Sequence, residues 1–371
     1  MLRSTYLVIL FFSLAFHETS LAQLPFVVSQ AFPDPGDTIF YQVDELPKRI
    51  SISAPGRNQF WNFGSLLGPY LQYQVIQSSS DRNDIMHFAG DQGSKNSFAE
   101  EATTLILRSA NSLKVGKTEI KAQWTTNEGL PMPSADMDYQ DNHEFSALFQ
   151  TALPADAAPT NWKPYLANGI DSIRISILVD RKMEVDATGM LFLINGYRQE
   201  SERFRVEDNL TKKIWTKKEN GDWQDVTSLT RIPDLQPEQR ISYHFVSLET
   251  AGNICSVLLD ENGSPQQVTF VIPKEQSGYY KTAANSQWLL AYPNPALSYV
   301  RFKFLDLAPG EYTLKFYDVF MRGLFEKKYQ VSGNETVEIN ISHLEKGPYV
   351  YSLQDKTGKK ITTKRLIVIK P

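Results

Sequence analysis

The chain has 371 residues and a formal net charge of −4, and this acidic balance argues against the basic surface that nucleic-acid binding requires. With 42% hydrophobic and 12% aromatic residues, the chain can build packed cores in about two or three domains. Cys255 is the single cysteine, so no disulfide can form within the chain and the cores must hold the fold together.

The N-terminus has the pattern of an export signal. Arg3 supplies a positive charge, and residues 6–16 form an apolar run that is too short to span a bilayer. Ser20 and Ala22 supply the small side chains of a cleavage site, so we expect cleavage between Ala22 and Gln23. The residue directly after that point is Gln23 and not a cysteine, which argues against a lipoprotein. No later segment has the pattern of a transmembrane helix.

Residues 23–273 alternate between short apolar runs and turns, which predicts an all-β region. We expect one large β-sandwich or two smaller ones. Trp61 and Phe63 alternate along one such run and are predicted to enter a core, with a sugar-binding platform as the alternative. Asn195 and Gly196 predict a hairpin. Residues 145–153 are the exception, since they predict one short helix.

The densest acidic stretch spans residues 136–144 and raises the question of a calcium site. Asp136 and Asp138 match the first two ligand positions of an EF-hand loop. Gln140 is a poor third ligand, Asp141 replaces the required glycine, and Ala147 stands where the glutamate should be. We therefore expect a solvated loop, with a surface calcium site of another type as the alternative.

The candidates for catalysis are few. Cys255 lies in an apolar run and is expected to be buried and inert, and nothing in the sequence brings His244 to it. Asp186 precedes Thr188 and Gly189, and we expect it to cap a turn rather than act as a catalytic carboxylate. Motifs of serine hydrolases, zinc proteases and nucleotide-binding loops are absent. We assign no catalytic, cofactor-binding or metal-ligating residue and expect no cofactor; a carboxylate pair stays open, because its spacing is set in three dimensions.

Residues 211–223 combine lysines with Trp215 and Trp223. An edge hairpin with lysines on one face and Trp215 on the other would fit this pattern. The functional alternative is a surface for an acidic polysaccharide. The polar residues 274–287 are predicted to be a linker.

Residues 288–371 predict a separate small domain. Two prolines, Pro293 and Pro295, flank Asn294 and enforce an extended start. Apolar residues then alternate along several short stretches separated by turns, as in Val300, Phe302 and Phe304. Six or seven such strands predict an Ig-like β-sandwich.

Spaced motifs of this region are found at Tyr292, Pro293, Asn294, Pro295, Gly347, Tyr349, Lys364 and Arg365. These motifs resemble those of the C-terminal sorting domain of the type IX secretion system, also called the Por secretion system. One position departs from the family pattern, because Met321 stands where a glycine is usual. The resemblance implies export through an outer-membrane translocon, usually with removal of this domain, and a cargo that stays on the cell surface or is released.

Residues 23–273, which would be the exported cargo, are also similar to other β-rich cargos of this secretion system, in segments near Trp61 and near Asp186. That similarity implies a fold and supplies no chemistry. The leading expectation is a non-catalytic binding or adhesion protein whose partners are the secretion machinery and a surface glycan. The alternatives are a secreted polysaccharide hydrolase with a carboxylate pair and a structural coat protein.

Overall fold

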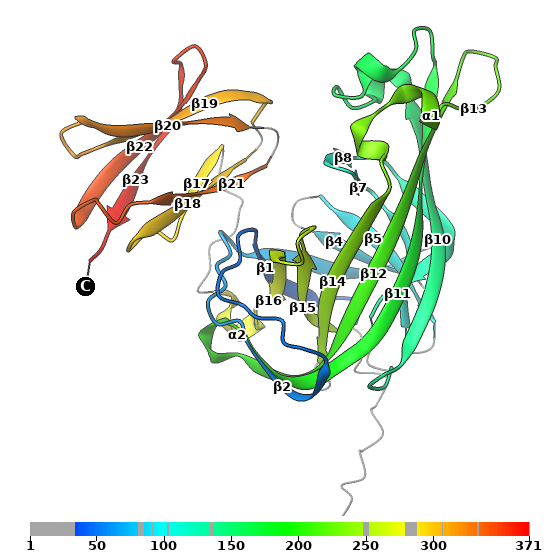
Figure 1. The fold of residues 1–371 in the computed structure, drawn as a ribbon, viewed down its shortest axis with the longest axis horizontal. Coiled ribbons are helices and arrows are strands. Elements are labelled where there is room, and N and C mark those ends of the chain that lie inside the picture. The colour runs from blue at the N-terminus through cyan, green and yellow to red at the C-terminus, as the bar shows by residue number, and fades with distance from the viewer. Residues whose placement is uncertain are drawn as a thin grey trace, which may run out of the picture.

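The computed structural model describes residues 34–370, apart from 81–84, 91–92, 102–103, 134–136, 248–251, 279–287, 306 and 332–333. The predicted signal peptide and its cleavage site at Ala22 and Gln23 lie outside the described residues. Two β-structures form the described chain, a large barrel and a smaller C-terminal sandwich beside it (Figure 1). The expected all-β class is confirmed.

Twelve strands pair in a closed ring to make the barrel. In spatial order they are β12 (Arg198–Lys217), β14 (Glu238–Ser247), β15 (Asn253–Leu259), β16 (Pro265–Val271), β1 (Thr38–Asp44), β3 (Gln72–Ser78), β4 (Ile85–Gly90), β5 (Lys95–Glu101), β6 (Thr104–Ala110), β9 (Trp124–Pro131), β10 (Asn142–Pro154) and β11 (Ser172–Phe192). Antiparallel pairing of β11 with β12 closes the ring. The expected β-sandwich fold of the cargo is therefore wrong. A sandwich keeps two separate sheets with free edges, whereas the closed ring of twelve strands has no free edge.

Shorter elements extend the ring or cover its ends. β2 (Gly56–Asn62) runs parallel to the end of β11, β13 (Gln224–Asp225) pairs with the end of β12, and β7 (Leu113–Val115) forms a hairpin with β8 (Thr118–Ile120). The helical turns are α1 (Thr227–Thr230), α2 (Lys274–Ser277), η2 (Ala155–Ala157), η3 (Lys163–Tyr165), η4 (Ile194–Gly196) and η5 (Pro233–Leu235). The turn at η4 connects β11 to β12, which confirms the hairpin predicted at Asn195 and Gly196.

The predicted helix at residues 145–153 is wrong, because this segment lies within the thirteen-residue strand β10. Ala147 and Phe149 alternate with exposed residues and pair with Val179 and Ile177 of β11. A long ladder of hydrogen bonds with β11 thus overrides the local preference for helix.

Separate cores lie on the two faces of the barrel wall. Ile173, Ile175 and Ile177 of β11 face a core that includes the β7–β8 hairpin and Trp162. Trp61 and Phe63 are fully buried in another core, where both rings pack edge-on against Phe245. The prediction that Trp61 and Phe63 enter a core is confirmed.

The C-terminal sandwich has two antiparallel sheets around one core. One sheet holds β17 (Leu289–Tyr292), β18 (Tyr299–Phe304) and β21 (Thr336–Asn340). The other holds β20 (Gly323–Val331), β19 (Gly310–Tyr317), β22 (Gly347–Asp355) and β23 (Lys360–Val368). Phe302 of the first sheet contacts Phe316 and Tyr351 of the second at ring-centroid distances of 5.6 and 4.9 Å. The alternating apolar residues read from the sequence supply this core.

Candidate functional site

The Pro-Asn-Pro segment of the C-terminal sandwich lies against the last strand of the chain. The Nδ2 group of Asn294 donates to the carbonyl of Arg365 at 2.9 Å, and its Oδ1 atom accepts from the amide of Ile367 at 2.9 Å. Ala296 continues this contact with two backbone hydrogen bonds to residues 367 and 369 at 2.8 Å. Both peptide bonds into Pro293 and Pro295 are cis. The structure thus joins motifs about 70 residues apart in the sequence.

The basic motif lies in this same region. Lys364 donates from Nζ to the carbonyl of Leu289 at 2.6 Å, and partial burial lowers the pKa of this amine. Arg365 is exposed beside it. Gly347 and Tyr349 lie on the neighbouring strand β22, and the Tyr349 hydroxyl donates to the carbonyl of Glu345 at 2.8 Å. Gly347 has φ +155°, in the region that favours glycine.

The turn between β19 and β20 is organised by Asp318. Its carboxylate accepts the amides of Phe320 and Arg322 at 2.9 and 3.0 Å and the Arg322 guanidinium at 2.6 Å. Desolvation raises the pKa of Asp318, but the hydrogen bonds from Arg322 and Phe320 and the Arg322 charge together outweigh it, so the pKa lies below its usual value. Met321 adopts a left-handed conformation at φ +60°, which explains why a glycine is usual here. Phe320 projects from the turn with 78% of its surface exposed.

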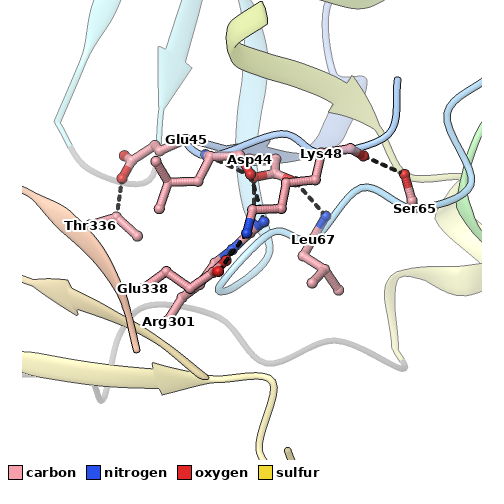
Figure 2. Close-up of polar contacts among 9 residues, drawn as sticks. Asp44, Glu45, Lys48, Ser65, Leu67, Arg301, Thr336 and Glu338 are labelled. Carbon is pink, nitrogen blue, oxygen red and sulfur yellow. Dashed lines mark hydrogen bonds and ion pairs between the residues drawn. The ribbon is translucent and has the colours of Figure 1, made fainter. Parts of the chain in front are cut away.

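The outer face of the β17–β18–β21 sheet meets the barrel through charged residues (Figure 2). Arg301 of β18 donates from Nη1 to Oδ1 of Asp44 at 2.7 Å and from Nη2 to the carbonyl of Leu46 at 2.6 Å. The side chains of Arg301 and Asp44 are 1% and 0% exposed. A buried charge of this kind is tolerated only when it is paired and hydrogen-bonded, so each of these two residues depends on the other.

The barrel side of this contact also holds Asp44 in place. Its carboxylate accepts the backbone amides of Leu46 and Leu67 at 3.0 and 2.8 Å. Burial raises the pKa of Asp44, and the Arg301 charge together with these amides opposes that shift. Residues of the barrel part of the chain therefore hold this carboxylate in place without any contact from the C-terminal sandwich.

Further charged pairs surround this one. Glu45 accepts from the Lys303 amine and from the Thr336 hydroxyl, and Lys48 pairs with Glu338 at 2.5 Å. The Lys303 amine also lies 5.7 Å from the ring of Tyr70, within the range of a cation–π contact. Acidic residues of the barrel thus meet basic residues of the sandwich. The pair of Lys48 and Glu338 is reversed, because its basic residue belongs to the barrel and its acidic residue to the sandwich.

Within the barrel, the residues considered for catalysis are held in structural contacts. Cys255 is buried, as expected, and burial raises the pKa of its thiol. His244 pairs with Ser256 while the adjacent Phe245 pairs with Cys255, so the imidazole and the thiol lie on opposite faces of the wall. Burial, with a smaller contribution from Arg181, lowers the pKa of His244 to about 4.

Asp186 plays neither of the roles considered from the sequence. It lies inside β11 at a bulge and accepts two hydrogen bonds from Arg203, at 2.8 and 3.0 Å. Arg203 also donates to the carbonyl of Ser53 at 2.8 Å and lies 5.5 Å from the Trp61 ring. The expected turn cap is wrong, because Asp186 forms a buried ion pair that ties β11 to β12 and to the segment before β2.

The basic segment of β12 also differs from its prediction. Lys212 is 4% exposed and pairs with Glu238 at 2.5 Å, whereas the next residue, Lys213, is exposed. Lys213 therefore shares a face with Trp215, and the expected separation of lysines from Trp215 is wrong. Trp223 stacks on Arg174 at 4.3 Å.

Sequence reasoning missed one residue of functional interest, Glu202 of β12. It is 9% exposed, and its Oε2 atom has no hydrogen-bond partner among the described residues. Burial raises the pKa of Glu202 to about 7, with smaller contributions from the charges of Asp138 and Asp141. Only the fold brings the acidic segment near 138–141 beside this strand, so no sequence spacing could have indicated the group.

Metal ligands do not cluster in the described part of the chain, where no group of three or more His, Cys, Asp or Glu side chains is arranged to hold an ion. Among the described residues, no helix combines the length and the apolar character needed to cross a membrane.

Comparison with protein families identifies the C-terminal sandwich. Residues 290–370 match the family described as the secretion system C-terminal sorting domain, so this part of the chain is a sorting domain of the Por, or type IX, secretion system. A domain of this family implies export across the outer membrane to the cell surface or the extracellular medium, and interaction with the secretion machinery. A search of the curated proteins finds no match to the chain.

Proposed function

We propose that the barrel is a non-catalytic binding or adhesion module that the sorting domain delivers to the cell surface or the medium. In this proposal residues 1–22 are the export signal, 23–273 the cargo, 274–287 a linker and 288–371 the sorting domain. The secretion machinery would recognise the region where Tyr292–Pro295 meets Lys364 and Arg365, beside Gly347 and Tyr349. The joining of these motifs by Asn294 supports this assignment.

The proposal of glycan binding rests on an exposed surface of strand β2. Phe60 and Asn62 are exposed on the same face of this strand, and Asn58 is exposed at the irregularity just before them. Phe60 has 61% of its surface exposed. The Phe60 ring lies 4.4 Å from the ring of Phe192 on β11, which widens the apolar surface. An exposed aromatic face flanked by amide groups is suited to stack on a sugar ring and to hydrogen-bond its hydroxyls.

A second candidate function, polysaccharide hydrolysis, is favoured by Glu202 alone. A carboxyl group that stays protonated near pH 7 beside ionised carboxylates is the pattern of a general acid and its partner in glycoside hydrolysis. Glu202 has this raised pKa, and Asp138 and Asp141 supply the neighbouring charges. The burial of Glu202 argues against it, since a general acid must reach the glycosidic oxygen.

Affinity electrophoresis through gels that contain a panel of neutral and acidic polysaccharides tests the proposal. We expect at least one polysaccharide to retard the protein, Phe60→Ala to abolish the retardation, and Leu229→Ala to retain it. Leu229 is the control, because it is an apolar residue of α1, outside this surface, that is even more exposed (76%). Release of reducing sugar that stops in Glu202→Gln would instead support the hydrolase. If the protein shows neither retardation nor release of reducing sugar, both candidates are overturned in favour of a coat protein.

A further inference from the structure

The outer face of the β17–β18–β21 sheet is covered, although a sheet in such a small sandwich normally leaves that face to solvent. In β18, Val300, Phe302 and Phe304 point into the sandwich core. Arg301 and Lys303 alternate with them on the outer face, yet they are only 1% and 5% exposed. The barrel covers this second face, because residues 44–46 supply hydrogen-bond partners to both side chains. Arg301 also pairs with Glu338 of its own sheet at 3.4 Å.

The charges across this contact are complementary over a whole row of the sheet. Tyr292, Arg301 and Glu338 lie opposite one another on β17, β18 and β21, and Lys303 lies opposite Thr336. On the barrel side, Asp44, Glu45 and Lys48 follow one another along a single turn. Arg301 meets Asp44, and Glu338 meets Lys48 (Figure 2). Lys303 meets Glu45. Complementary charges of this kind fix the register of two surfaces more than they add affinity.

The barrel side of the contact is built at the seam where the N-terminal and C-terminal strands of the barrel meet. Asp44 is the last residue of β1, and it pairs with Val268 of β16, more than 200 residues later in the chain. The amide of Leu67, from the segment before β3, donates to the same carboxylate. Asp44 therefore takes this position only when β1 has paired with β16.

We propose that the turn at residues 44–48 is a docking surface for the chain's own sorting domain, and that it forms when the barrel closes between β1 and β16. Docking masks Arg301 and Lys303 on β18. A chain with an open barrel leaves both cations exposed, so the surface of the sorting domain differs between a folded and an unfolded cargo.

Acetylation of lysines in the full-length protein, followed by mass spectrometry, tests the docking. Lys328 is an internal reference, since its side chain is 64% exposed and pairs with Glu311 inside the sorting domain, away from the contact. We expect Lys303 to react at least tenfold more slowly than Lys328, and the Glu45→Gln variant to bring the two rates closer. Equal rates for Lys303 and Lys328 in the unmodified protein would overturn the proposal.

Two matched substitutions test the dependence on barrel closure. Val268→Ala loosens the seam opposite Asp44, and Val179→Ala makes the same change at a buried position of β11, in a different core. We expect Val268→Ala to speed acetylation of Lys303 at least threefold and Val179→Ala to leave it unchanged, with circular dichroism confirming that both variants fold. An equal effect of the two substitutions would contradict the link to closure while leaving the docking itself intact.

Discussion

Asn294 accepts the amide hydrogen of Ile367 through Oδ1 at 2.9 Å, and this contact joins the first motif of the sorting domain to its last strand. The other end of the same side chain donates to the carbonyl of Arg365 at 2.9 Å. One amide side chain thus satisfies a donor and an acceptor on the edge of β23 that does not pair with β22. The arrangement explains why asparagine, with both groups on a short stem, stands between the two prolines.

The first prediction concerns this side chain. Asn294→Ala removes both hydrogen bonds and should destabilise the sorting domain by about 1–3 kcal/mol, because two backbone groups of β23 lose their partners. Urea unfolding of the full-length protein, followed by peptide-resolved hydrogen exchange over residues 360–370, measures this effect. Asn262→Ala, in an exposed hairpin turn of the barrel, is the control and should change little. Equal stability of both variants would contradict a bridging role for Asn294.

The second prediction concerns the turn at Met321. Its left-handed conformation is costly for a residue with a side chain, so Met321→Gly should stabilise the sorting domain by about 1 kcal/mol. The Met321 side chain is 51% exposed, and little burial is lost with it. Met321→Ala keeps the Cβ atom and should give no such gain. Thermal unfolding distinguishes the two variants, and a gain in Met321→Ala equal to that in Met321→Gly would argue against backbone strain.

The third prediction concerns the ion pair between Asp186 and Arg203. Asp186→Ala should cost about 3–5 kcal/mol of barrel stability, because it leaves a fully buried guanidinium without its counter-charge. Glu207→Ala breaks the more exposed pair with Arg205 and should cost less than about 1 kcal/mol. Urea unfolding of the barrel gives both values. A similar cost for the two substitutions would show that burial does not set the strength of the Asp186 pair.

The fourth prediction is a pH dependence caused by Glu202. Burial raises the pKa of Glu202 to about 7, from 4.5 as the usual value, and the charges of Asp138 and Asp141 act in the same direction. The folded state therefore binds this proton more tightly than the unfolded state between about pH 4.5 and pH 7. Across that range the contribution of Glu202 to stability falls as the pH rises, by about 2 kcal/mol once solvent screening is allowed for.

Glu202→Gln stays neutral at every pH and should remove this fall. Glu144→Gln is the control, since Glu144 is an exposed glutamate near the start of β10, which β11 separates from β12. Urea unfolding at a series of pH values measures the difference between each variant and the unmodified protein. A pH profile unchanged in Glu202→Gln would show that Glu202 ionises at its usual pKa in the folded protein.

The sequence by itself determined the features that depend on neighbouring residues. Alternating apolar side chains predicted strands and an all-β fold, Asn195 and Gly196 predicted the β11–β12 turn, and the spaced motifs from Tyr292 to Arg365 identified the sorting domain. Each of these signals acts over a few residues or within one small domain. Local alternation also correctly predicted that Trp61 and Phe63 are core residues.

Only the tertiary structure decided which strands pair and which charges meet. A barrel and a sandwich are built from the same alternating strands, and they differ in the long-range pairing that joins β1 to β16. Arg301 and Lys303 have the pattern of a solvent-facing row, yet the barrel buries them against Asp44 and Glu45. Charge burial depends on what the fold places opposite a residue, and the partners of these two lie more than 250 residues away in the chain.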